Sequence, residues 1–179
     1  LLGVVGIAGL IKMEPYRMRR FDAYMDPFND PYGKGYHIIQ SLLAMGSGGL
    51  MGVGIGQSHQ KFAYLPEEHT DFIFSIVGEE LGFVGASLVV GLYLMLFWRG
   101  IRTSLNAPDL YGMLLALGLI GGIIIQATLN VAVVIGAAPT TGVTLPLISY
   151  GGSSLVFTMA SIAVILNISL AGERERLTK

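Results

Sequence analysis

The chain has 179 residues, and its composition is that of a membrane protein, because hydrophobic residues make up 53% of it and charged residues only 13%. Its formal net charge of −1 offers no basic surface for nucleic acid, so no nucleic-acid partner is predicted. It contains no cysteine, which excludes disulfides, thiolate nucleophiles and cysteine-ligated metals.

The first apolar run covers residues 1–13 and is shorter than the roughly 20 residues that a membrane-spanning helix needs. No basic region precedes this run and no small-residue cleavage site follows it, so a signal peptide is not predicted. We expect residues 1–13 to be the outer end of a truncated span.

Residues 14–70 are expected to form a large extracytoplasmic loop with short interfacial helices. One such helix is predicted at residues 36–45, where apolar side chains recur at helical spacing. The stretch that follows, residues 46–56, alternates glycines with apolar residues, which suggests an interfacial or re-entrant element. Its spacing does not fit a phosphate-binding or dinucleotide-binding loop.

Several basic residues lie in this loop and just before it, although lysine and arginine are usually enriched in cytoplasmic loops rather than in outer ones. One explanation is that long loops cross the membrane regardless of charge, with acidic neighbours balancing the cations. The other is an external site for an anionic headgroup, because arginine and lysine suit phosphate or pyrophosphate. Both explanations stay open for Lys12, Arg17, Arg19, Arg20, Lys34 and Lys61.

Three further apolar stretches predict transmembrane helices at residues 71–98, 109–138 and 153–171. Pro139 is expected to stop the second of them. A short loop after the first helix carries Arg99 and Arg102, and it lies on the same side as the charged tail, residues 172–179, if the spans alternate. The positive-inside rule places that side in the cytoplasm.

Residues 139–152 connect the last two spans and contain two prolines and three glycines around an apolar centre. A continuous helix is therefore excluded, and irregular backbone at membrane depth needs protein cover or a wet cavity. We predict an extracytoplasmic re-entrant loop that folds back over a site.

Small and polar residues mark two of the predicted spans. The first span carries small residues at three- and four-residue steps, and the second carries two glycines four residues apart, so both predict close helix packing. Gln126 and Asn130, one helical turn apart, either hydrogen-bond between helices or line a polar cavity. The small residues are Ser75, Gly78, Gly82, Gly85, Gly118 and Gly122.

Six sequence motifs follow one another along the chain: Gly46-Ser-Gly-Gly49, Gly54-Ile-Gly-Gln-Ser58, Tyr64-Leu-Pro-Glu67, His69-Thr-Asp-Phe-Ile-Phe74, Glu79-Glu-Leu-Gly82 and Leu145-Pro-Leu-Ile-Ser-Tyr-Gly-Gly-Ser-Ser154. Taken together they resemble the SEDS family, named for shape, elongation, division and sporulation, over essentially the whole chain. The string Lys12-Met-Glu-Pro-Tyr-Arg-Met-Arg-Arg20, with Asp26-Pro27 and Asp30-Pro31 after it, is more similar to the FtsW and SpoVE branch than to RodA.

The resemblance implies an all-α, polytopic transmembrane helical bundle of about ten helices, of which this chain is the C-terminal part. It further implies polymerisation of lipid II into glycan strands at the outer face of the bacterial cytoplasmic membrane, with a class B penicillin-binding protein as partner. It does not separate division from sporulation or elongation. The family's essential aspartate matches Asp71.

Asp71 is therefore the predicted general base, which accepts the proton of a sugar hydroxyl while a diphosphate leaves. The structural alternative is that an acidic residue in the first turn of a helix compensates the helix dipole. Glu79, two turns further on, has either a supporting or metal-linked role or an ion pair with another helix. Predicted substrate-binding residues are Lys61 and Arg20, which would hold the diphosphate, together with Glu67, His69, Gln126, Asn130, Ser149 and Ser153.

No bound cofactor is assigned from the sequence, and a divalent cation, Mg²⁺ or Mn²⁺, that helps the diphosphate stays an open alternative. Two other functions also stay open. Polar residues within the spans and the broken loop around Pro146 suit a transporter that flips lipid II. The glycine faces suit a noncatalytic scaffold that positions a penicillin-binding protein.

Overall fold

The computed structural model describes residues 24–28, 35–57 and 71–177. All regular secondary structure in these ranges is helical, namely α3 (Tyr36–Ser47), α5 (Ile73–Leu105), α6 (Leu110–Val134) and α7 (Gly152–Leu177). The last three helices are long and apolar enough to cross a membrane, with mean hydropathies of 2.0, 2.0 and 2.1. The prediction of an all-α membrane bundle is confirmed.

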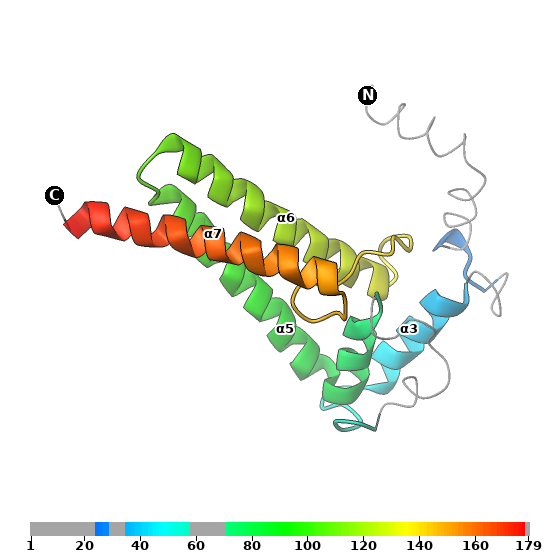
Figure 1. Ribbon diagram of the computed structural model, residues 1–179. Coiled ribbons are helices and arrows are strands. Elements are labelled where there is room, and N and C mark those ends of the chain that lie inside the picture. The colour runs from blue at the N-terminus through cyan, green and yellow to red at the C-terminus, as the bar shows by residue number, and fades with distance from the viewer. Residues whose placement is uncertain (1–23, 29–34, 58–70, 178–179) are drawn as a thin grey trace, which may run out of the picture.

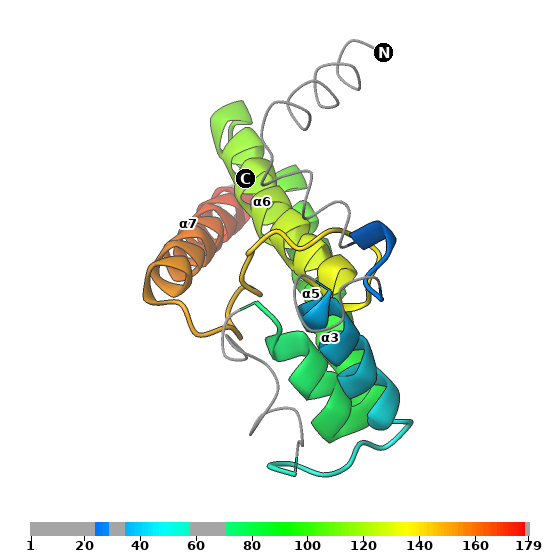
Figure 2. The same ribbon diagram turned by 90° about the vertical axis from the view of Figure 1, so that its right-hand side faces the viewer.

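Helix α6 packs against both α5 and α7, and α3 packs against the first part of α5 (Figure 1). The end of α5, the beginning of α6 and the end of α7 share one end of the bundle. The opposite end carries α3 and the loop between α6 and α7, as Figure 2 also shows. Large apolar side chains such as Phe83, Leu88 and Phe157 are exposed along the spans, as expected for surfaces that face lipid or further helices.

Helix α5 is broken at Gly82, whose φ of 66° and ψ of −165° are accessible essentially to glycine alone. In an unbroken helix the amides of Phe83 and Val84 would donate to the carbonyls of Glu79 and Glu80. A glycine-rich segment, residues 48–54, pairs with all four groups instead. Its bonds are Phe83 N to Gly49 O (2.9 Å), Val84 N to Leu50 O (3.2 Å), Val53 N to Glu79 O (3.0 Å) and Gly54 N to Glu80 O (3.1 Å).

All four backbone groups at the break therefore have a partner. This matters because unpaired backbone groups are costly near a membrane. The sequence predicted an interfacial or re-entrant element at this glycine-rich segment, but it gave no sign that the segment would dock into a helix. It also predicted no interruption of the span that begins near Asp71.

The helix ends differ from the predicted spans at three places. Helix α5 continues past residue 98 to Leu105, so Arg99 and Arg102 lie on the helix and their placement in a loop was wrong. Arginine is a good helix former, and a cation near a helix C-terminus is favoured by the dipole. Helix α7 likewise runs through the charged tail to Leu177.

Helix α6 ends at Val134, before Pro139, so the prediction that this proline stops it was wrong. Gly136 ends the helix, because its φ of 71° allows a Schellman motif. In that motif Gly136 N donates to Val133 O (3.0 Å) and Ala137 N donates to Ala132 O (2.7 Å). At its other end α6 is capped by Asp109, whose carboxylate accepts from Gly112 N (3.3 Å).

The two predicted small-residue faces behave differently. Met45 of α3 packs against Gly78, and the glycine-rich segment packs against Gly82, so the first face is a packing surface as predicted. No described atom lies within 4 Å of a Cβ built at Gly118 or Gly122. The second face is therefore open within the described part of the chain.

Candidate functional site

Asp71 lies in the turn just before α5, at the end of the bundle that carries α3 and residues 139–152. Because re-entry into the membrane is the prediction for residues 139–152, we call them the re-entrant loop. Its side chain is half-buried, and one carboxylate oxygen lies 3.5 Å from the position that a Cβ on Gly142 would occupy. Gly142 has a φ of 71°, a conformation that favours glycine. The carboxylate thus lies against bare backbone of the loop.

Asn130 of α6 holds this arrangement together. Its side chain is 1% exposed, and its amide nitrogen donates to the backbone carbonyls of Asp71 (2.8 Å) and Val143 (2.7 Å). Both amide hydrogens are used in this way, which fixes the orientation of the amide group. One buried side chain therefore ties the start of α5 to the re-entrant loop, the structural role that the sequence left open for it.

Gln126, one turn earlier on α6, ties the same loop to α7. Its amide nitrogen donates to the carbonyl oxygen of Thr144 (3.0 Å) and lies 3.3 Å from the Thr144 hydroxyl and 3.5 Å from the Ser154 hydroxyl. The Thr144 hydroxyl in turn donates to that of Ser154 (3.1 Å). Gln126 and Asn130 thus hold adjacent parts of one loop from one face of α6.

Leu145 and Pro146 in the centre of the loop are buried, and hydrogen bonds hold this part of the backbone in place. The Leu145 amide donates to the Ser149 hydroxyl (2.7 Å), the Ser149 amide donates to the Leu145 carbonyl (2.9 Å), and the Tyr93 hydroxyl of α5 donates to the Pro146 carbonyl. Leu147 has a φ of 68°, which is rare for a residue other than glycine and marks local strain. Such a loop is held in one shape by its neighbours, as a preorganised site requires.

Helix α3 borders the site on another side. The His37 ring stacks on Phe72, the residue after Asp71, with ring centroids 5.8 Å apart and planes 13° apart. Buried Ser41 donates to the Val134 carbonyl at the end of α6 (2.8 Å). The first turn of α5 is therefore clamped between α3 and α6.

The structure brings some of the predicted site residues together and not others. Asp71, Gln126, Asn130 and Ser149 gather around the re-entrant loop, and Ser153 is exposed at the start of α7. Glu79, on α5, is 1% exposed. Four predicted residues lie outside the described ranges, namely Arg20, Lys61, Glu67 and His69.

Three contributors to the site were missed from sequence, namely Tyr93, Thr144 and Ser154. A tyrosine in the middle of an apolar span was the available signal, because a buried hydroxyl needs a partner. Thr144 and Ser154 lie within or beside a recognised motif, but their spacing alone does not say which residue bonds them. Among the described residues, no group of three or more His, Asp or Glu side chains is arranged to hold a metal ion.

A family model described as a cell cycle protein, and named for FtsW, RodA and SpoVE, matches residues 1–174. The chain belongs to this family. Stage V sporulation protein E of Bacillus subtilis (strain 168) is 54% identical over 169 residues, which cover 94% of this chain and 46% of that protein. A probable peptidoglycan glycosyltransferase FtsW of Geobacter sp. (strain M18) is 47% identical with the same coverage.

Solved structures agree with this placement. A structure described as showing the structural coordination of polymerization and crosslinking by a peptidoglycan synthase complex matches with a TM-score of 0.72 and 35% identity, covering 96% of this chain and 48% of that chain. The crystal structure of RodA from Thermus thermophilus matches with a TM-score of 0.55 and 40% identity, covering 72% and 38%. The resemblance to the SEDS family and its FtsW and SpoVE branch is confirmed.

The chain spans about half the length of the curated relatives that it matches. Its helices and its family fit a multi-pass protein of the bacterial cytoplasmic membrane.

Proposed function

We propose that this chain provides the site of a peptidoglycan glycosyltransferase that polymerises lipid II at the outer face of the cytoplasmic membrane. The observation that carries the proposal is the position of Asp71, a half-buried carboxylate at the end of a membrane span, tethered by Asn130 to a re-entrant loop. A relative named as a probable peptidoglycan glycosyltransferase supports the reaction class.

In this proposal Asp71 is the general base. Its carboxylate accepts the proton of the acceptor sugar hydroxyl while that oxygen bonds to the anomeric carbon of the donor and the bond to the lipid diphosphate breaks. A carboxylate at the end of a membrane span can reach both the sugar hydroxyl and the diphosphate that links the donor to its lipid. Gly142 leaves space beside it, because no side chain projects from that point of the loop.

Asn130 and Gln126 act on the loop and on the backbone at Asp71, so we assign them positioning roles. The amide nitrogens of both side chains donate to protein groups, and Asn130 is almost completely buried. Fixing the carboxylate in advance lowers the entropic cost of reaching the reactive geometry. Ser153 is exposed at the edge of the loop, so it is better placed than Asn130 or Gln126 to contact substrate.

The leaving diphosphate needs positive charge, and Lys61 and Arg20 stay our candidates for it. A divalent cation that helps the diphosphate is part of the proposal, with substrate phosphates supplying some of its ligands. Mg²⁺ often binds through one or two carboxylates together with substrate phosphates, and Asp71 could provide one such carboxylate. The cation would neutralise charge on the diphosphate.

The end of the bundle that carries Asp71 faces outward in this proposal. Arg99, Arg102 and Arg176 lie at the other end, which the positive-inside rule assigns to the cytoplasm. A class B penicillin-binding protein is the proposed partner, supported by the similarity to a structure of a peptidoglycan synthase complex.

The proposal is tested with the natural full-length protein, purified in detergent and supplied with lipid II. Asp71→Asn should abolish glycan synthesis while expression and partner binding are preserved. Asp109→Asn is the matched control, because it removes the same charge at the opposite end and asparagine also caps helices well. Glycan synthesis by Asp71→Asn at the control's rate would refute the general-base assignment.

The same experiment separates the alternatives. A lipid II transporter forms no glycan in detergent but moves labelled lipid across vesicles. A scaffold keeps its effect on the partner synthase when Asp71 is replaced.

A further inference from the structure

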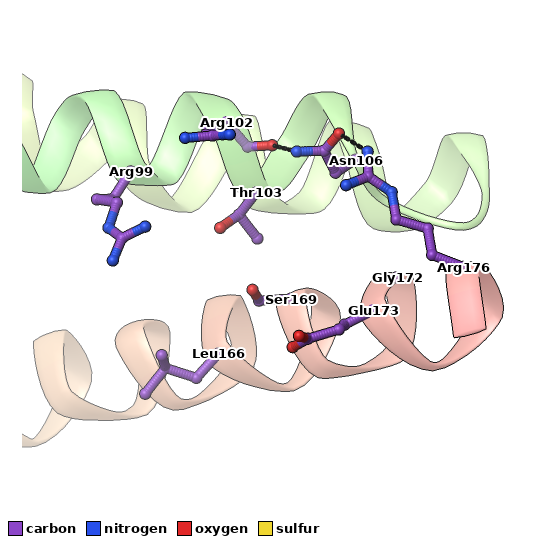
Figure 3. A pocket seen from close by; sticks show the side chains of 9 residues that line it. All are labelled: Arg99, Arg102, Thr103, Asn106, Leu166, Ser169, Gly172, Glu173 and Arg176. Carbon is purple, nitrogen blue, oxygen red and sulfur yellow. Dashed lines mark hydrogen bonds between the residues drawn. The ribbon is translucent and has the colours of Figure 1, made fainter.

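A polar pocket lies at the end of the bundle opposite Asp71, between the last turns of α5 and α7 (Figure 3). Its volume is about 460 Å³. Arg99 and Arg102 of α5 and Arg176 of α7 line it, and Glu173 is the acidic residue among its lining side chains. Three guanidinium groups and one carboxylate give this arginine pocket a formal charge of +2.

Asn106 joins the two helices at the pocket's edge. Its amide nitrogen donates to the Arg102 carbonyl (2.7 Å), and its amide oxygen accepts from the guanidinium of Arg176. The guanidinium of Arg99 and the carboxylate of Glu173 both project into the space between the helices (Figure 3). Within the described ranges neither Arg99 nor Arg102 forms an ion pair, so their positive charge is not neutralised by those residues.

The surroundings place the pocket at the depth of lipid headgroups. Trp98, directly before Arg99, is 68% exposed, and tryptophan is enriched where a membrane meets water. Leu166, which lines the pocket from the middle of α7, is 59% exposed. The pocket therefore combines a cationic wall with an exposed apolar edge.

We propose that the arginine pocket binds the headgroup of an anionic phospholipid, with phosphatidylglycerol as the probe chemistry. Guanidinium groups bind phosphate oxygens through paired, charge-assisted hydrogen bonds, and Thr103 and Ser169 add hydroxyl donors on facing helices. Glu173 accepts hydrogen bonds from glycerol hydroxyls, whereas it repels a bare second phosphate. Basic pockets between spans are suited to anionic headgroups of the cytoplasmic leaflet.

A bound headgroup would bridge α5 and α7 at the end where Asn106 and Arg176 already connect them. The inference does not depend on the chemistry proposed at Asp71, because the two sites lie at opposite ends of the bundle. Loss of lipid binding and loss of glycan synthesis can therefore be measured separately.

The test uses the full-length protein in phosphatidylcholine nanodiscs titrated with phosphatidylglycerol, with bound lipid counted by native mass spectrometry. Arg99→Gln and Arg176→Gln should each weaken binding about fivefold, and the double variant about thirtyfold, as expected for about 1 kcal/mol per arginine. Arg174→Gln is the matched control, since it removes the same charge two residues from Arg176 but from a side chain that does not line the pocket. A melting temperature of the double variant equal to that of the unmodified protein shows that the variant is folded.

Four outcomes would overturn the proposal. Binding by the double variant equal to that of the unmodified protein would exclude the pocket. Equal weakening by Arg174→Gln would indicate general attraction to an anionic surface. Binding of inorganic phosphate in pure phosphatidylcholine, competing with phosphatidylglycerol, would assign the site to soluble phosphates, and absence of any bound lipid would indicate that a protein segment fills it.

Discussion

Replacing Gly82 by alanine should destabilise the protein strongly, because the break in α5 depends on this residue. Its backbone angles are those of a region that other residues occupy only at a cost of about 1–3 kcal/mol. An added Cβ would also lie 2.6 Å from the Leu50 carbonyl oxygen and closer still to the Gly52 amide nitrogen. These are backbone atoms, so the clash cannot be relieved by rotating a side chain.

Relief of the clash would displace the glycine-rich segment and break its four hydrogen bonds to α5. At about 1 kcal/mol net for each bond, the four bonds add about 4 kcal/mol to the strain. We expect a total loss of about 5–7 kcal/mol. At roughly 2–4 °C per kcal/mol for a domain of this size, the melting temperature should fall by at least about 10 °C.

Gly91→Ala is the matched control in the same helix. No described atom lies within 4 Å of a Cβ at that position, and alanine favours helix by about 1 kcal/mol over glycine. Both variants of the full-length protein are heated in detergent, and the fraction that stays monodisperse is followed by size-exclusion chromatography. Equal melting of Gly82→Ala and Gly91→Ala would refute the role assigned to the break.

Other variants test the loop and the helix ends. Asn130→Leu should leave two partly buried carbonyls unpaired, at up to about 1–3 kcal/mol each, and should reduce glycan synthesis more than Gln126→Leu; equal rates would contradict the tether to Asp71. Gly142→Ala should slow synthesis without changing expression, because it forces a left-handed backbone on alanine beside Asp71; an unchanged rate would show that the loop tolerates a side chain there. Tyr93→Phe should lower stability by about 1 kcal/mol through loss of its bond to Pro146, and a melting temperature that does not fall would exclude that contribution.

Hydrophobic length predicted the three long helices well, because a run of apolar residues has few alternatives to a membrane helix. Helix ends were predicted less well. Pro139 was the visible stop signal for α6, yet Gly136 ends the helix earlier by adopting a left-handed conformation. In a chain with 25 glycines, sequence alone does not show which glycine will do so.

The break at Gly82 could not be predicted for a related reason. It exists because the glycine-rich segment, which is distant in sequence, supplies the donors and acceptors that the helix gives up. The position of Asp71 near a span was readable from sequence, and the family motifs made it a candidate. The sequence did not show that Gly142 and Val143 are neighbours of Asp71, because they come close to it only when the re-entrant loop folds back.

The general-base role of Asp71 is tested most directly by a structure of the full-length protein bound to lipid II or a close analogue, in which one distance is measured. The account predicts that an Asp71 carboxylate oxygen lies within about 2.6–3.2 Å of the acceptor sugar hydroxyl, or reaches it through one water. A carboxylate turned away from the sugar, with another side chain at that hydroxyl, would contradict it.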